Sequence, residues 1–111
     1  MNVSYKNNKL QKNLNDALAI KKHFGENAKR VAARMADLSA AGTLAELCTI
    51  PQAACHPLTG DRSGEWAMAI SANHRLIFTI DQDPVPLDST GGIDRIKVTD
   101  IRIIEAGTDY H

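Results

Sequence analysis

The sequence predicts a single α+β domain over residues 1–111, in which an N-terminal strand and a helical hairpin pack on a twisted antiparallel β-sheet. Two observations support this fold class. Apolar residues recur at helical spacing in the first half of the chain, whereas after Pro51 they alternate with polar residues, which is the period of a strand. The alternating runs are joined by short turns, as in an antiparallel meander. A chain of 111 residues can bury a sufficient core without a metal ion or a disulfide.

The first half predicts one strand and two helices. Residues 2–5 form the strand, and a first helix follows it as far as Gly25. A second helix runs from about Asn27 to Gly42. Because the turn at Gly25 is short, the helices must form an antiparallel hairpin whose apolar stripes most simply cover a sheet. The stripes contain Leu10, Leu14, Ala17, Leu18 and Phe24 in the first helix and Ala28, Val31, Ala32, Met35 and Leu38 in the second.

The second half predicts three or four antiparallel strands. Residues 56–58 form a short strand, and residues 65–72 and 75–80 alternate around a hairpin turn at Asn73-His74. Residues 81–94 are an acidic stretch with Pro and Gly, expected to be an extended hairpin loop. In the last strand, residues 95–104, the apolar residues change phase by one, so a β-bulge is expected near Thr99-Asp100.

The net charge of zero conceals an asymmetry. Residues 1–34 hold eight Lys or Arg against two Asp or Glu, a net of +6, which leaves −6 for residues 35–111. A basic half suggests an anionic partner, either nucleic acid or an acidic protein segment. The alternative is that these charges are only the solvated faces of two helices.

The composition indicates a soluble, non-exported protein. The first residues are polar, and no apolar run approaches the roughly 20 residues that span a bilayer. Cys48 and Cys55 are too few for a disulfide scaffold and do not form a CxxC pair.

Several residues could carry chemistry. His56 precedes a turn, Arg75 opens a strand directly after a turn, and the chain ends in a phenol and an imidazole at Tyr110 and His111. The structural alternatives are a non-catalytic histidine, an arginine that protects a sheet edge, and a frayed terminus. Arg62 is interpreted as solvated, and His23 and His74 as structural.

Zinc binding is not expected. Cys48, Cys55, His56 and His111 could supply four ligands, but their spacing lacks the short pairs of structural zinc sites.

If the partner is RNA and the protein cleaves it, the groups that the reaction needs can be stated. Metal-free cleavage uses the RNA 2′-hydroxyl as the nucleophile, so it needs a base, an acid for the leaving 5′-oxygen, and a cation for the phosphorane. His56, Arg75, Tyr110 and His111 supply such a set if the last strand pairs beside a neighbouring strand's end.

Three stretches together resemble one family. "ACHPLTGDRSGEWAMAISANHRLIF", "RMADLSAAGTLAEL" and the terminal "DYH" are similar to the RelE/ParE toxin superfamily, specifically its HigB-like killer-protein branch. The resemblance covers nearly the whole chain and implies a RelE-like fold. It implies the toxin of a type II toxin–antitoxin pair, a cytoplasmic, ribosome-dependent endoribonuclease without a cofactor that cleaves mRNA.

The resemblance also implies residue roles. The family's active-site histidine falls on His56, its strand-opening arginine on Arg75, and its terminal motif on Asp109, Tyr110 and His111. Arg75 would hold the scissile phosphate, and the two histidines would be the acid and the base in either order. Tyr110 would stack on a base or orient the proton transfer, and Asp109 would orient a neighbour.

The expected partners are a helix-turn-helix antitoxin of the HigA type, mRNA and the 16S rRNA of the ribosome. The residues expected to bind RNA are Lys6, Lys9, Lys12, Lys21, Lys22, Lys29, Arg30, Arg34 and Arg62. Residues 81–94 depart from the family pattern, because the segment is long and acidic; it contacts the antitoxin or is decorative.

Two other functions fit the same fold. A ParE-like poison of DNA gyrase needs no acid–base set, and a non-toxic interaction module would use the charge asymmetry only for protein pairing.

Overall fold

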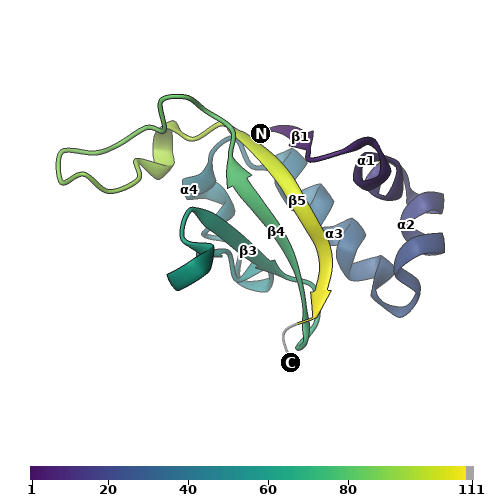
Figure 1. Cartoon of the computed structure of the whole chain (residues 1–111). Helices are drawn as coiled ribbons and strands as arrows, with labels where there is room; N and C mark the ends of the chain where they lie inside the picture. Colours follow the sequence, from purple (N-terminus) through teal and green to yellow (C-terminus); the bar gives the residue numbers. More distant parts are fainter. Residues whose placement is uncertain (110–111) are drawn as a thin grey trace.

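The computed structural model describes the backbone of residues 1–109 and the side chains of residues 1–107. Within this part of the chain, five strands form one sheet in the order β1-β5-β4-β3-β2 (Figure 1). The strands are β1 (Asn2–Tyr5), β2 (His56–Pro57), β3 (Glu65–Ala69), β4 (His74–Ile80) and β5 (Asp100–Asp109). The helices are α1 (Asn8–Leu14), α2 (Ala17–Phe24), α3 (Ala28–Ala40) and α4 (Leu44–Leu47). The predicted α+β class is therefore confirmed.

The direction of β1 corrects the expectation of a purely antiparallel sheet. β1 pairs with β5 in parallel, from Asn2 opposite Asp100 to Tyr5 opposite Ile103. The strands β2 to β5 are antiparallel to their neighbours, as predicted. The last strand lies between β1 and β4, so the backbone groups on its second edge are paired with β1 rather than left open.

The first predicted helix is in fact two helices. α1 ends at Leu14, and α2 begins at Ala17 after Asp16, whose carboxylate accepts a hydrogen bond from the Ala19 N–H at 2.8 Å. Such a cap satisfies an amide at the start of a new helix. Gly25 ends α2 with a φ of 51°, and a single 3₁₀ turn (Gly25–Asn27) leads into α3.

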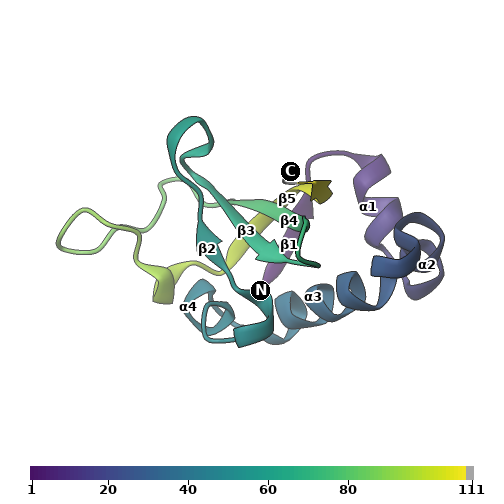
Figure 2. The same cartoon turned by 90° about the horizontal axis from the view of Figure 1, so that it is seen from below.

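The main core lies between the helices and one face of the sheet. α3 and α4 lie along that face, while α1 and α2 lie beyond its β1 edge (Figure 2). Trp66 and Phe78 stack there with ring centroids 6.4 Å apart. The fully buried residues around them include Val31, Leu38, Leu44, Leu47, Met68, Leu76, Ile101 and Ile103.

The predicted bulge at Thr99-Asp100 is wrong. Ile96 lies in a 3₁₀ turn (Arg95–Lys97) and is 72% exposed, so the phase change there comes from the end of a turn. The real irregularities lie further along β5, where Ile104 and Gly107 have no partner in the register with β4. Gly107 takes a φ of 79° at the second of these.

The acidic excursion, residues 81–94, is an extended hairpin loop as predicted, and it projects from the body (Figure 1). Gln82 fixes its base, because the Gln82 side-chain oxygen accepts from the Thr99 and Asp100 N–H groups. Leu87 pairs with Ile93 near the tip, and the Asp94 N–H donates to the Pro86 carbonyl.

None of the helices in the described residues is long and apolar enough to cross a membrane.

Candidate functional site

The candidate site lies on the open face of the sheet, opposite the helices. His56, Ala67, Ile77 and Glu105 are aligned across strands β2, β3, β4 and β5. Paired residues project to the same face, and Ala67 and Ile77 are fully buried yet lie outside the helix-side core. This row therefore lies on the face of the sheet away from the helices, which we call the open face, although Ala67 and Ile77 at its centre are themselves covered.

Arg75 lies on the same face as this row. It pairs with Ala69 on β3 and Thr108 on β5, two residues along β4 from Ile77. From strand spacing, the Cα atoms of His56 and Arg75 are about 12 Å apart. The structure thus brings His56 and Arg75 to one face, as the expected site requires.

The imidazole of His56 is held in one tautomer. The His56 Nδ1 lies 2.8 Å from the carbonyl oxygen of Ala54, which can only accept a hydrogen bond. Nδ1 must therefore carry the proton, and in the neutral ring Nε2 has the free lone pair. Ala54 has a φ of 45°, a left-handed conformation that is uncommon for a residue with a side chain. The exposed imidazole thus presents Nε2 outward.

The terminal motif is placed only in part. The backbone of Asp109 pairs with His74 at the start of β4, next to Arg75. The Asp109 side chain, Tyr110 and His111 lie outside what the structure describes, so their predicted roles stay predictions. The path of β5 brings the backbone of Asp109 to the end of the sheet where Arg75 lies.

His74 was interpreted from sequence as structural, and its described side-chain contact agrees with that interpretation. Its Nδ1 lies 2.9 Å from the Ser71 hydroxyl, which holds the ring against the β3–β4 turn.

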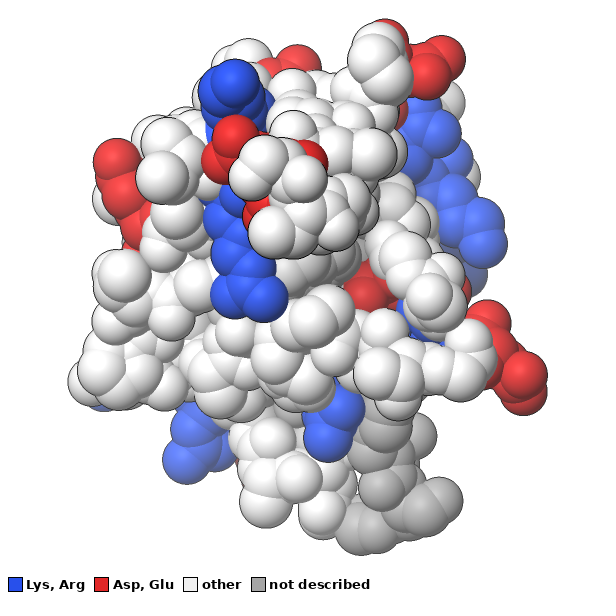
Figure 3. Space-filling view, turned by 90° about the vertical axis from the view of Figure 1, so that its left-hand side faces the viewer, with Lys and Arg blue, Asp and Glu red and all other residues white. Residues whose placement is uncertain are grey.

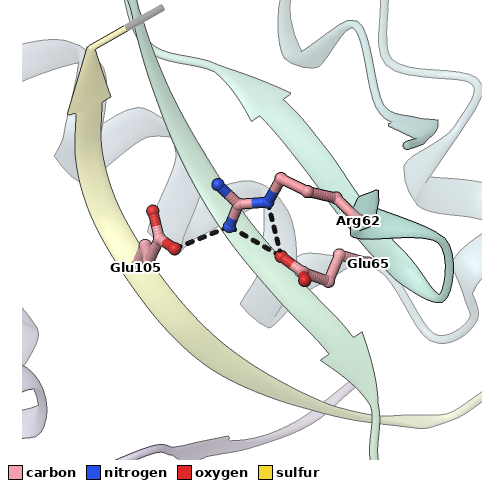
Figure 4. A network of polar contacts seen from close by, with 3 residues as sticks. All are labelled: Arg62, Glu65 and Glu105. Carbon is pink, nitrogen blue, oxygen red and sulfur yellow. Dashed lines mark hydrogen bonds and ion pairs between the residues drawn. The ribbon is translucent and has the colours of Figure 1, made fainter. Parts of the chain in front are cut away.

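Arg62 is paired rather than solvated, which corrects the sequence interpretation. Its guanidinium donates to Glu65 from Nε at 2.9 Å and from Nη2 at 2.6 Å, and Nη2 also donates to Glu105 at 2.6 Å. Figure 4 shows the guanidinium lying across β4, between the carboxylates of β3 and β5. The hydrogen bonds to Glu65 and Glu105 raise the pKa of Arg62 further above its usual range, so it remains a cation. We call these three residues the Arg62 clamp.

Glu65 and Glu105 were not among the candidate site residues predicted from the sequence. Glu65 alternates with Trp66, which faces the core, and this alternation was the available signal that Glu65 faces the other way. Glu105 follows the irregularity at Ile104, so simple alternation from Ile103 would have assigned it to the wrong face.

Most of the residues expected to bind RNA are exposed on or beside the helices. Arg34 differs, because its side chain is only 11% exposed and its Nε lies 2.9 Å from Asp37. Arg34 also donates to the carbonyl of Gln52, joining α3 to the 3₁₀ turn Pro51–Ala53. The exposed residues are Lys6, Lys9, Lys12, Lys21, Lys22, Lys29 and Arg30.

The described residues contain no group of three or more His, Cys, Asp or Glu that could hold a metal ion. Cys48 and Cys55 are both free thiols. Burial, followed by the neighbouring Cys48, raises the pKa of the Cys55 thiol, which keeps it protonated and a poor ligand or nucleophile. Arg95 covers this corner, with its guanidinium 3.8 Å from the Cys48 sulfur and 4.9 Å from the Trp66 ring centroid.

Comparison with known proteins supports the fold. No protein-family model matches the chain, and no curated protein matches it. A solved YoeB/ParE toxin from Agrobacterium tumefaciens is 14% identical, with a TM-score of 0.52, and the match covers 99% of this chain and 100% of that chain. The YoeB–YefM complex from Staphylococcus aureus is 14% identical, with a TM-score of 0.54 over 99% of this chain and 98% of that chain. A YoeB dimer from Staphylococcus aureus is 16% identical, with a TM-score of 0.51 over 100% of this chain and 97% of that chain. The chain therefore has the fold of the YoeB/ParE toxins, and the predicted RelE-like fold is confirmed.

Proposed function

We propose that this protein is the toxin of a toxin–antitoxin pair and that it cleaves mRNA on the ribosome. One observation carries the proposal: on a fold shared with YoeB/ParE toxins, the open sheet face holds His56 and Arg75, and β5 ends beside Arg75. The HigB-like branch is supported by the sequence resemblance in the same residues.

The cleavage would proceed without a metal ion. Arg75 holds the scissile phosphate and stabilises the charge that gathers on its oxygens as the 2′-hydroxyl attacks. His56 transfers a proton through Nε2, because its Nδ1 is committed to the Ala54 carbonyl. His111 supplies the second acid–base group, Tyr110 stacks or orients the proton transfer, and Asp109 orients a neighbour. The products are a 2′,3′-cyclic phosphate and a 5′-hydroxyl.

The exposed lysines of the helices would dock the protein on 16S rRNA. Lys6, Lys9 and Lys12 lie near the β1 edge, and Lys21, Lys22 and Lys29 lie on α2 and α3. In contrast, the end of the molecule that carries the excursion shows acidic and basic groups interspersed among uncharged surface (Figure 3). Arg34 and Arg62 contribute less to this docking, since each already has a carboxylate partner.

An antitoxin is the second proposed partner. One structural neighbour is a complex of YoeB with YefM, and the sequence resemblance favours an antitoxin of the helix-turn-helix, HigA-like type. Action on translating ribosomes would place the protein in the cytoplasm.

The test is cleavage of ribosome-bound mRNA by purified protein, mapped by toeprinting. Arg75→Ala, and separately deletion of Tyr110 and His111, should abolish the cut and the growth arrest while the far-ultraviolet circular dichroism is retained. Arg102→Ala is the matched control, because Arg102 lies on β5 opposite Thr79, away from Arg75. If the chain lacking Tyr110 and His111 still cuts at the wild-type rate, the catalytic assignment is wrong.

A ParE-like gyrase poison is the alternative, since one neighbour carries the description YoeB/ParE toxin. It predicts DNA-damage induction without any ribosomal cut, and normal growth on induction would instead favour an interaction module.

A further inference from the structure

The excursion, residues 81–94, has the properties of a docking element. It holds Asp81, Asp83, Asp88 and Asp94 with no Lys or Arg, a net charge of −4. It also exposes apolar groups near its tip, with Leu87 59% and Val85 37% exposed. The tip is ordered from within, because one Asp88 carboxylate oxygen accepts from the Thr90 N–H, the Thr90 hydroxyl and the Gly92 N–H. A preformed loop loses little conformational freedom on binding.

The opposite end of the molecule has a groove of complementary character. A cavity of about 350 Å³ lies between α2 and α3, and Ala17, Ile20, Ala28 and Ala32 form its apolar wall. Lys21 and Lys29 line it as well, with Glu26 the one acidic lining residue. A groove of this volume can receive apolar side chains of the size of leucine.

We propose that the excursion of one copy of this chain docks into the α2–α3 groove of a second copy. The apolar tip, Val85 and Leu87, would contact the alanine and isoleucine wall, while the aspartates face Lys21 and Lys29. Charge complementarity within one chain argues for this occupant, since the −4 loop and the lysine-lined groove belong to the same protein.

Two complementary surfaces at opposite ends of one chain can pair in a closed two-fold dimer or in an open head-to-tail chain. The excursion and the α2–α3 end lie at opposite ends of the molecule (Figure 1), whose longest dimension is 44 Å. In the proposed arrangement two copies lie antiparallel, so that each excursion lies beside the other copy's groove. Such a pair has two-fold symmetry and two identical contacts, so it closes as a dimer and does not extend into a filament.

Each contact is a loop tip in a groove and is small beside a standard protein interface, so we expect a weak dimer that dissociates on dilution and in high salt. Self-association does not rest on nuclease activity. It does involve Lys21 and Lys29, which the proposed function assigns to rRNA, so dimer formation and ribosome docking should exclude each other.

The test is charge exchange, followed by sedimentation velocity of the full-length chain over a range of concentrations. The first variant, K21E/K29E, makes the groove acidic. The second, D81K/D83K/S89K, changes the net charge of the excursion from −4 to +1 while leaving Asp88 to hold the turn. Each variant alone should be monomeric, because both of its contacts are repulsive. A one-to-one mixture should form a dimer, because each basic surface then meets an acidic one. K9E/K12E is the matched control, with the same charge change on α1, and should dimerise as the wild type does.

A wild-type chain that stays monomeric at every concentration would overturn the proposal. So would variants that dimerise alone, or a mixture that does not. If the wild type is monomeric and D81K/D83K/S89K loses only the binding of its antitoxin, the excursion is an antitoxin contact and self-docking is wrong. If the wild type dimerises but does not cut ribosome-bound mRNA, only the proposed function is contradicted.

Discussion

Two carboxylates, Glu65 and Glu105, face each other across β4, and the Arg62 guanidinium lies between them. Without that cation the two negative charges would repel each other and any approaching phosphate. The side chains of Arg62, Glu65 and Glu105 are 34%, 24% and 38% exposed, so solvent screens the attraction and its net contribution to folding is modest. The clamp matters more for the charge presented by the face than for stability.

We predict that Arg62→Ala lowers the free energy of unfolding by about 1 kcal/mol, in the range found for exposed ion pairs with good geometry. A double-mutant cycle with Glu105→Gln isolates the pair and should give a coupling of about 0.5–1 kcal/mol by urea denaturation. A coupling near zero would mean that the pair contributes nothing to folding.

Asp88 has a pKa below its usual range, chiefly because of the Thr90 hydroxyl and then the Thr90 and Gly92 amides. A lowered folded-state pKa means that the stabilisation is present above the ordinary carboxyl pKa and is lost as the pH falls through the lowered value. We predict that hydrogen-exchange protection of the Thr90 and Gly92 amides decreases below about pH 4. Asp88→Asn is the control and should show no such pH dependence; equal behaviour of the two proteins would contradict this explanation.

At the scale of the elements, the register of β5 determines which of its residues lie on the open face. The unpaired residues Ile104 and Gly107 each shift the alternation by one, so Ile103 and Ala106 both face the helix side while Glu105 and Thr108 pair with open-face residues of β4. Without these two irregularities, the last residues of the strand would project differently relative to Arg75.

We predict that Gly107→Ala destabilises the protein by at least about 1 kcal/mol, because a φ of 79° is strained for any residue with a side chain. The added Cβ would also lie 3.6 Å from the Phe24 ring, which is ordinary contact, so backbone strain is the main cause. Gly42→Ala is the control, since Gly42 lacks a positive φ, and thermal unfolding compares the two. A similar loss in both variants would contradict the strain argument.

The helices and strands differ in how far the sequence could predict them. The change of period at Pro51 separated the helical half from the strands and located α3 and the β3–β4 hairpin, because buried faces dictate period directly. The direction of β1 was not predictable, since a four-residue alternation is the same in a parallel or an antiparallel strand. The break before Asp16 was missed because Leu14, Ala17 and Leu18 continue one apolar stripe through it, although Asp16 is itself a capping residue.

In the candidate site, too, local features were predictable from the sequence and long-range pairings were not. His56 and Arg75 were found from their positions beside turns, which are local features. The pairing of Arg62 with Glu105 joins residues 43 positions apart, so only the sheet register reveals it. The roles of Asp109, Tyr110 and His111 remain predictions.

At the scale of the whole molecule, the lysine-bearing helices α1 and α2 lie at one end and the acidic excursion at the other (Figure 2), although the excursion's end also carries basic groups (Figure 3). A molecule of zero net charge with this separation orients in the field of an anionic surface, helices first. Ribosome binding should therefore depend steeply on salt despite the neutral total.

We predict that K9Q/K12Q weakens ribosome binding in a co-sedimentation assay. The slope of log affinity against log salt should become shallower by about one unit for each rRNA phosphate that the variant no longer neutralises. Lys97→Gln is the control, because Lys97 is 74% exposed but follows the excursion. An unchanged slope in K9Q/K12Q would remove α1 from the docking surface.

The hairpin geometry of the excursion also makes it a graft site. Pro86 and Asp94 are joined by a backbone hydrogen bond of 2.9 Å, so residues 87–93 leave and re-enter the fold at one place. Below that point, Gln82 ties the base to Thr99 and Asp100, and the fully buried Val98 anchors the return. The tip is thus a self-contained cassette: it can be exchanged for a short turn, a peptide epitope or a fluorophore-binding loop while the open face and the core keep their register.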